Sequence, residues 1–174
     1  FEGIDLTSLF TEPLAPVRDY VFAEKNWHDY EDHARAVRNE RYKYIRNYFE
    51  DLPLTPPADV VRSATHVELI RLYEKGELTP AQAICFVAPR PAEELYDLKL
   101  DPHELNNLAA DDRYFSVLRA MRAARADWEA KTEDAVPTLR TADEFDRLTG
   151  LPTPARVRPR PAKNEMVEQG LVSP

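Results

Sequence analysis

The chain has 174 residues, 43% of them apolar and 31% charged, which fits one domain or one domain with tails. Its net charge of -8 argues against nonspecific nucleic-acid binding, which requires a basic surface. No apolar run approaches the roughly 20 residues of a membrane-spanning helix, so we expect no membrane span. Because of the negative net charge we also expect no nucleic-acid partner. The single cysteine, Cys85, excludes an internal disulfide and a cysteine-based zinc site.

Proline rather than glycine divides the chain, with 15 prolines and only four glycines. No two glycines lie close enough to form a loop that cradles phosphates or a cofactor. Residues 1–16 carry a short apolar pattern that ends in a proline-bounded break. We interpret them as the end of a preceding domain or as a linker.

Alternating apolar and polar residues predict several short strands. The first is expected over residues 20–24, and a polar loop follows at 26–33. Residues 35–38 and 42–49 predict the two strands of a hairpin. A further strand is expected over residues 94–98.

Apolar residues at three- and four-residue steps predict the helices. One helix is expected over residues 58–75, with Thr55-Pro56 as its cap and first turn. A short helix is expected at about 79–86, and another at 143–148. The clearest helix covers residues 112–131 and carries one continuous apolar stripe.

Short strands followed by helices segregated in the sequence predict an α+β fold. We expect a small, mainly antiparallel sheet of about four strands, packed against the long helix at 112–131, with extra helices beside it. Residues 17–135 would form this domain. Residues 136–174 would form an extended C-terminal tail, because the chain becomes rich in proline and arginine after Leu151.

The densest group of titratable residues lies in the expected polar loop. Its members are His28, Asp29, Glu31, Asp32 and His33. Such groups can hold a divalent metal or transfer protons, but their spacing matches no ligand motif. A solvated loop is the preferred interpretation, ahead of a substrate-contacting loop and of a metal site. His66 and His103 have no obvious partner, so we expect both on the surface.

The expected hairpin is also basic and aromatic. Its cations are Arg35, Arg38, Arg41, Lys43 and Arg46. Guanidinium groups suit sulfate and carboxylate because they donate two parallel hydrogen bonds. A solvated strand face balanced by nearby acidic residues explains the same pattern. No catalytic triad, carboxylate pair or metal motif is present, so we expect no catalytic and no metal-binding residues in this chain.

Two stretches go beyond a generic pattern and resemble the C-terminal portion of sulfatases of the alkaline phosphatase superfamily. The first is Glu94-Leu95-Tyr96-Asp97-Leu98, then Asp101-Pro102-His103-Glu104-Leu105-Asn106-Asn107-Leu108-Ala109, followed by the long helix. In it we expect a strand and then one or two helical turns that end near Ala109. The second is Trp27-His28-Asp29-Tyr30 leading to the hairpin at 35–47.

The greatest likeness is to the heparan N-sulfatase, or sulfoglucosamine sulfohydrolase, group. The resemblance implies a C-terminal subdomain of an enzyme that removes sulfate, as an ester or a sulfamate, from a sulfated sugar. It also implies that the parent enzyme uses calcium and a formylglycine residue in an N-terminal catalytic domain. Cys85 does not fit the formylglycine motif, because its proline lies four positions on, at Pro89. We therefore expect no cofactor in this chain and no activity from the fragment alone.

The resemblance further implies that the segment with His28 lies near the substrate mouth, with Trp27, Asp29 and Arg35 as companions. These four residues are the candidate substrate-binding residues. The implied partners are the N-terminal sulfatase catalytic domain, to which residues 1–16 would lead, and the sulfated sugar, with a homo-oligomer as a further option. A periplasmic or extracellular location is expected from the family.

Two alternatives stay open at this point. The chain could be a non-catalytic binding or interaction module that uses its basic tail as the contact. It could also belong to a related hydrolase of phosphate esters or phosphonates with the same C-terminal architecture. An exposed apolar patch on the sheet, where a catalytic domain would dock, would favour the sulfatase interpretation.

Overall fold

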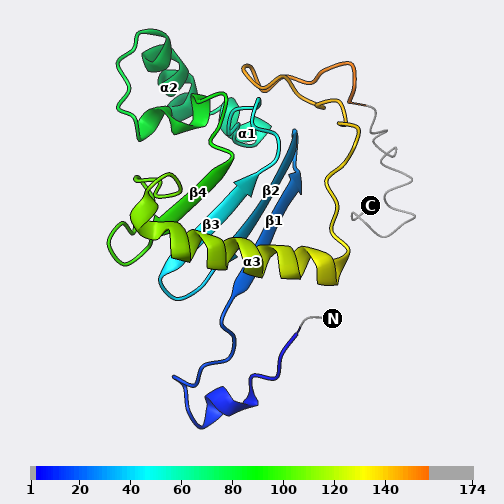
Figure 1. Cartoon of the computed structure of the whole chain (residues 1–174). Helices are drawn as coiled ribbons and strands as arrows, with labels where there is room; N and C mark the ends of the chain where they lie inside the picture. The colour runs from blue at the N-terminus through cyan, green and yellow to red at the C-terminus, as the bar shows by residue number, and fades with distance from the viewer. Residues whose placement is uncertain (1–2, 157–174) are drawn as a thin grey trace, which may run out of the picture.

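The computed structural model describes residues 3–156, which form an antiparallel sheet with a long helix across one face (Figure 1). The four strands lie in the order β1-β2-β3-β4, so each one pairs with its neighbour in sequence. The elements of this layer are β1 Val21–Trp27, β2 Glu31–Arg38, β3 Tyr42–Asn47, β4 Glu93–Asp97 and α3 Phe115–Thr132. The α+β class, the four-stranded antiparallel sheet and the long helix packed against it are confirmed.

The main core lies between the sheet and α3. Val37, Tyr44 and Leu95 are direct neighbours across β2, β3 and β4, and all three side chains are fully buried. Leu118 and Met121 of α3 pack on this row from above. The helix stripe and the strand alternation therefore meet in the register that the hydrophobic pattern requires.

Polar and aromatic contacts fix the position of α3 along the sheet. Trp128 stacks on Phe22 of β1 with ring centroids 5.4 Å apart. At the other edge, the Arg122 guanidinium pairs with Glu93 of β4 and lowers the pKa of that carboxyl to about 2. The helix ends where Glu133 adopts a left-handed conformation with φ of 56°.

The single helix expected over residues 58–75 is wrong, because the segment forms two helices. They are α1 Ala58–Val61 and α2 Ala64–Glu74. The Ser63 side chain between them accepts a hydrogen bond from the His66 N–H at 3.2 Å, which starts a new helix. Gly76, with φ of 69°, ends α2.

The polar loop expected at 26–33 is also wrong. β1 and β2 both extend into it, and only the turn at 28–30 separates the two strands. Glu31, Asp32 and His33 belong to β2 and are buried, not solvated. Periodicity could not show this, because the covering residues come from distant parts of the chain.

The other short helices differ from expectation as well. The helix expected at 79–86 is a 3-10 segment, η2 Gln82–Phe86. The helix at 143–148 does not form, since the Asp146 side chain accepts hydrogen bonds from the N–H groups of Leu148 and Thr149. Turns replace the helical turns expected at 101–109, where Asp101 accepts a hydrogen bond from the Asn106 N–H at 2.7 Å.

A second small core holds the segment after α3 against the hairpin tip. Phe145 packs with Tyr30 and Ala58. Gly150 lies so close that an added methyl group would meet the Ala58 carbonyl oxygen at 2.6 Å. Part of the expected tail thus lies on the domain, while residues 157–174, with Arg158, Arg160 and Lys163, lie outside the described residues.

Two histidines are buried outside the two core clusters. His66, expected on the surface, has only 6% of its surface exposed and stacks on Phe86 at 5.5 Å. His33 is 2% exposed and packs edge-on against Tyr48. Burial lowers the pKa of both imidazoles below 6.5, and the neighbouring Arg35 guanidinium lowers that of His33 further.

We predict that the free energy of unfolding falls as the pH is lowered from 7 to 5.5. Below about pH 6.5 the unfolded chain takes up protons on His33 and His66 that the folded chain does not, so acid favours unfolding. Each histidine changes the free energy of unfolding by at most about 1.4 kcal/mol per pH unit. Urea unfolding at the two pH values measures the difference.

The variants His33→Phe and His66→Phe keep an aromatic ring in each site and should reduce this difference. His103→Gln, which replaces an exposed histidine, is the control. An unchanged pH dependence in the double Phe variant would contradict the prediction.

Candidate functional site

A cavity of about 490 Å³ opens at the tip of the β1–β2 hairpin. Such a volume is typical of small-molecule sites. It combines an aromatic ring, an exposed imidazole, cations and carboxylates. Its lining includes Lys25, Trp27, His28, Tyr30, Glu31 and Arg147.

Two of the four predicted substrate residues, Trp27 and His28, line this cavity. A register shift in the pairing between Lys25 and Trp27 turns the end of β1 where the cavity begins. The His28 side chain is 68% exposed, and its Nδ1 atom lies 3.2 Å from Asp29 Oδ2. An exposed imidazole beside an indole ring can contact a bound ligand.

Asp29 lies in the same turn but faces the helical part of the domain. Its Oδ2 atom accepts a hydrogen bond from the Ala58 N–H at 2.7 Å, which satisfies the first residue of α1. The expected cap by Thr55-Pro56 is therefore wrong, since the capping oxygen comes from the hairpin tip. Asp29 positions His28 and joins the tip to α1.

Arg35, the fourth predicted residue, lies away from the cavity. Its side chain is 2% exposed and makes two hydrogen bonds, of 2.6 and 2.7 Å, to the carboxylate of Asp134 beyond α3. The guanidinium lowers the pKa of Asp134 in return. Arg35 thus forms an ion pair with Asp134 on the α3 side of the sheet. It does not line the cavity that holds His28.

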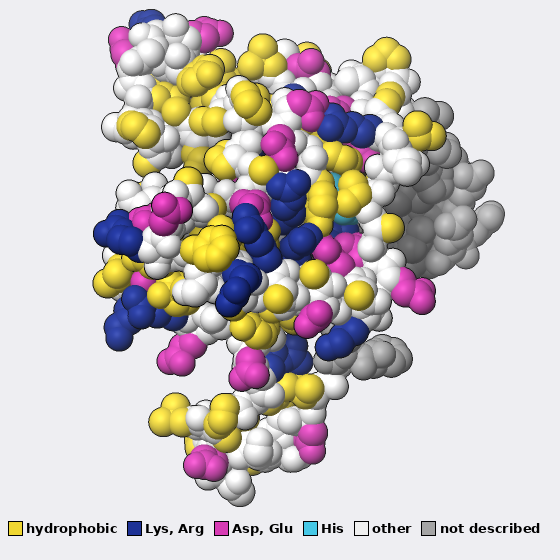
Figure 2. Space-filling view, in the orientation of Figure 1, with side chains coloured by type: hydrophobic (Ala, Val, Ile, Leu, Met, Phe, Trp, Pro, Cys, Tyr) yellow, Lys and Arg dark blue, Asp and Glu magenta, His cyan; other side chains and the backbone are white. Residues whose placement is uncertain are grey.

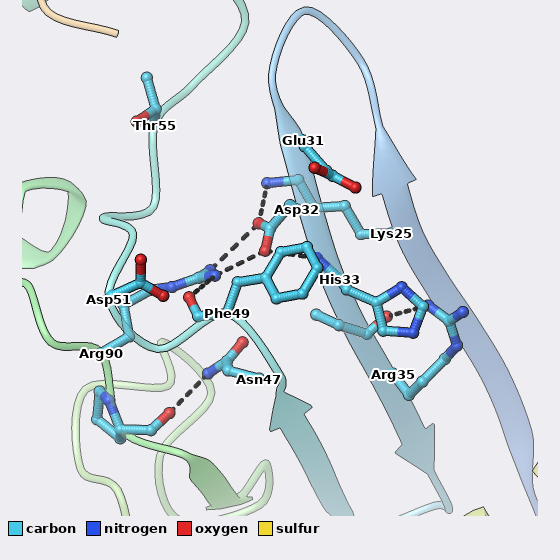
Figure 3. A network of polar contacts seen from close by, with 12 residues as sticks. Lys25, Glu31, Asp32, His33, Arg35, Asn47, Phe49, Asp51, Thr55 and Arg90 are labelled. Carbon is cyan, nitrogen blue, oxygen red and sulfur yellow. Dashed lines mark hydrogen bonds and ion pairs between the residues drawn. The ribbon is translucent and has the colours of Figure 1, made fainter. Parts of the chain in front are cut away.

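A buried ion pair supports the floor of the cavity (Figure 3). Arg90 donates to both oxygens of Asp32, at 2.6 and 3.2 Å, and also to the Phe49 carbonyl. Lys25 approaches the same carboxylate at 2.9 Å. Burial favours the neutral acid, but hydrogen bonds from Arg90 and Lys25 hold the pKa of Asp32 below its usual value.

Glu31 is a cavity residue that the sequence did not single out from its acidic neighbours. Its backbone N–H donates to Asp143 Oδ1 at 3.0 Å, and Arg147 donates to its carbonyl at 2.6 Å. The side chain is buried, yet its Oε2 atom has no hydrogen-bond partner. Only the fold reveals this, because both backbone contacts come from more than a hundred residues away.

The described part of the chain offers binding groups but no catalytic assembly. Among residues 3–156, no group of three or more His, Cys, Asp and Glu side chains could hold a metal ion. The same residues contain no helix long and apolar enough to cross a membrane. Cys85 is half-buried, and burial raises the pKa of its thiol, which disfavours the reactive thiolate.

The sheet face opposite α3 is open and forms a groove of about 460 Å³. Its lining combines small and apolar side chains with charged ones, which include Glu24, Lys25, Asp32, Lys43, Arg90, Glu94 and Glu104. The apolar lining residues are Ala23, Ala34, Ala36, Ile45, Leu54, Ile84, Val87, Pro91 and Leu105. Figure 2 shows further apolar side chains gathered over the α2 part of the molecule.

Comparison with known proteins finds sulfatases, although no family model matches the chain. An ulvan-active sulfatase of Formosa agariphila is 41% identical over 113 residues, which are 64% of this chain and 19% of that protein. The human N-sulphoglucosamine sulphohydrolase is 29% identical over 132 residues, 74% of this chain and 26% of that enzyme. The chain thus spans about a fifth to a quarter of the length of these relatives.

Solved structures share the fold. A putative sulfatase from Bacteroides thetaiotaomicron superposes with a TM-score of 0.50 at 23% identity, over 90% of this chain and 27% of that one. A 2-O GAG sulfatase gives a TM-score of 0.50 at 24% identity, over 95% and 27%. The sequence is thus similar to a part of the sulfatases, and the fold is shared with solved sulfatase structures. These findings support the interpretation as a sulfatase C-terminal portion, with relatives that include N-sulphoglucosamine sulphohydrolase.

We predict that Asp29→Ala lowers the free energy of unfolding by about 1 kcal/mol, because the first N–H of α1 loses its acceptor. Asp29→Asn keeps a side-chain oxygen in place and should cost less. Urea denaturation of both variants measures the difference. Equal stability of the Ala variant and the unmodified protein would contradict the capping role.

Proposed function

We propose that this chain is the C-terminal subdomain of a sulfatase that acts on a sulfated sugar. In this proposal it supplies structure and part of the substrate rim and has no activity by itself. The observation that carries the proposal is the pairing of an open apolar sheet face with a ligand-sized cavity at its edge. The names of the relatives, which refer to ulvan and sulphoglucosamine, support a sugar substrate.

The open face is where we place the catalytic part of the enzyme. A contiguous apolar surface in water is unfavourable and marks an interaction site. The relatives are about four to five times longer than the matched segment, so most of their chain lies elsewhere. Apolar side chains on the arm before β1 also need cover, with exposures of 87% at Phe10 and 95% at Leu14.

The cofactors belong to that catalytic part in this proposal. Calcium needs several oxygen ligands, and residues 3–156 provide no such cluster. The sequence around Cys85 lacks the spacing of a formylglycine motif. We therefore assign calcium and formylglycine to the catalytic domain, and no step of the reaction to this chain. A periplasmic or extracellular location is part of the same proposal.

The first test uses the full-length natural protein that contains this segment. His28→Ala and Trp27→Ala should each lower kcat/KM for a sulfated sugar by about tenfold or more, since they remove substrate contacts at the rim. Hydrolysis of a small aryl sulfate, which does not reach the rim, should stay unchanged. His103→Ala, at an exposed position away from the cavity, is the control.

Unchanged kinetics in both rim variants would contradict the rim role. Failure of the unmodified full-length protein to release sulfate from any sulfated sugar would contradict the proposed function itself.

The second test concerns docking. Ala36→Arg places a long charged side chain in the middle of the open groove and should destabilise the full-length protein more than this segment alone. Ala120→Arg, on the exposed side of α3, is the matched control and should affect neither. Thermal unfolding of the two variants in both lengths makes the comparison.

Equal effects of Ala36→Arg in both lengths would contradict docking at this face. A segment that forms dimers until Ala36→Arg is introduced, with no effect in the full-length protein, would instead assign the groove to a second copy.

A further inference from the structure

Glu31 lines the cavity, and one oxygen of its carboxylate has no hydrogen-bond donor. The residue is 6% exposed, and the Oε2 atom makes no hydrogen bond within the described structure (Figure 3). Buried polar groups in proteins are nearly always hydrogen-bonded, because an unpaired one loses its water without compensation. A buried acceptor of this kind at a cavity wall points to a donor that enters the cavity.

The nearby cations have other hydrogen-bond partners. Arg140, whose charge interacts with that of Glu31, donates to both oxygens of Asp51 at 2.7 and 2.6 Å. Lys25 is paired with Asp32 at 2.9 Å. Arg147 is paired with Asp143 at 2.6 Å and donates to the Glu31 carbonyl. These side chains are already satisfied, so the structure leaves the Glu31 carboxylate available.

The backbone around the carboxylate is fixed at both ends. The Glu31 N–H and carbonyl groups are bound by Asp143 and Arg147 of the segment that follows α3. The Arg147 guanidinium also lies over the Tyr30 ring, 5.1 Å from its centroid. A fixed acceptor loses little conformational entropy when a ligand binds, which favours affinity.

An aromatic ring lies beside this acceptor. Trp27 is the direct partner of Glu31 in the antiparallel register, and both residues line the cavity. Side chains of directly opposed residues share one face of the sheet and lie about 5 Å apart at their Cβ atoms. A flat indole next to a carboxylate suits a sugar ring, whose C–H face can stack while its hydroxyl groups donate hydrogen bonds.

We propose that Trp27 and Glu31 form a subsite for a sugar unit that presents unsulfated hydroxyl groups. Glu31 accepts hydrogen bonds from those hydroxyls, and Trp27 stacks on the ring. A carboxylate repels a sulfate group, so a unit sulfated at the edge that faces Glu31 is disfavoured. The inference rests on the proposed function, because it describes how the rim binds a sugar unit other than the one that loses its sulfate.

Binding rather than turnover tests this subsite. The full-length natural protein is titrated with unsulfated methyl glycosides of glucose, galactose, rhamnose and N-acetylglucosamine, and with their monosulfates. Tryptophan fluorescence and ligand-observed NMR report binding. Glu31→Leu should weaken binding of the preferred unsulfated glycoside by about tenfold or more, because a charge-assisted hydrogen bond is lost. Glu31→Gln, which retains a carbonyl oxygen, should weaken it less.

Glu40→Leu removes an exposed glutamate of the β2–β3 turn and is the matched control, with binding unchanged. No binding of any unsulfated glycoside, or equal binding by the unmodified protein and both Glu31 variants, would overturn the subsite. Unchanged sugar binding with a large loss of stability in the Leu variant would show that Glu31 pairs with a protein donor, which also overturns it. Sugar binding without sulfate release would leave the subsite in place and refute the proposed function.

Discussion

The buried ion pair between Asp32 and Arg90 joins three segments that the sheet alone would leave apart. Asp32 lies at the start of β2, Arg90 precedes β4, and the same guanidinium donates to the Phe49 carbonyl after β3. Breaking a buried pair by removal of one partner costs about 3–5 kcal/mol, because the other charge stays without compensation. The position of the hairpin tip, and of the cavity beside it, depends on this contact.

The segment after α3 completes the tip from the other side. Phe145 fills the small core with Tyr30 and Ala58, and Arg147 and Asp143 bind the backbone of Glu31. These contacts use the polar groups of the main chain and leave the Glu31 carboxylate without a donor. The geometry of the candidate site is thus a consequence of how the two cores close. The unpaired Oε2 atom of Glu31 lies in this site, and Arg90 Nε and His33 Nε2 are further buried atoms without a partner in the described structure.

The two faces of the sheet differ in what covers them, and this difference supports the proposal that the domain is part of a larger enzyme. One face is closed by α3 through Val37, Tyr44 and Leu95, which are fully buried. The other face carries short apolar side chains and has no covering helix in the described structure (Figure 1). In our proposal a catalytic domain packs on that face as a further layer.

The sequence by itself determined the α+β class, the four strands, the long helix and the sulfatase likeness, because alternation, helical periodicity and the run from Glu94 to Ala109 are local. Local signals could not show that Ser63 divides a helix or that Glu31, Asp32 and His33 are buried. The partners of these residues lie far along the chain: Arg90 is 58 residues from Asp32, and Asp134 is 99 from Arg35. Only tertiary packing decided that Asp32 and Asp134 are neutralised by arginines and that a buried oxygen of Glu31, beside the cavity, is left without a donor.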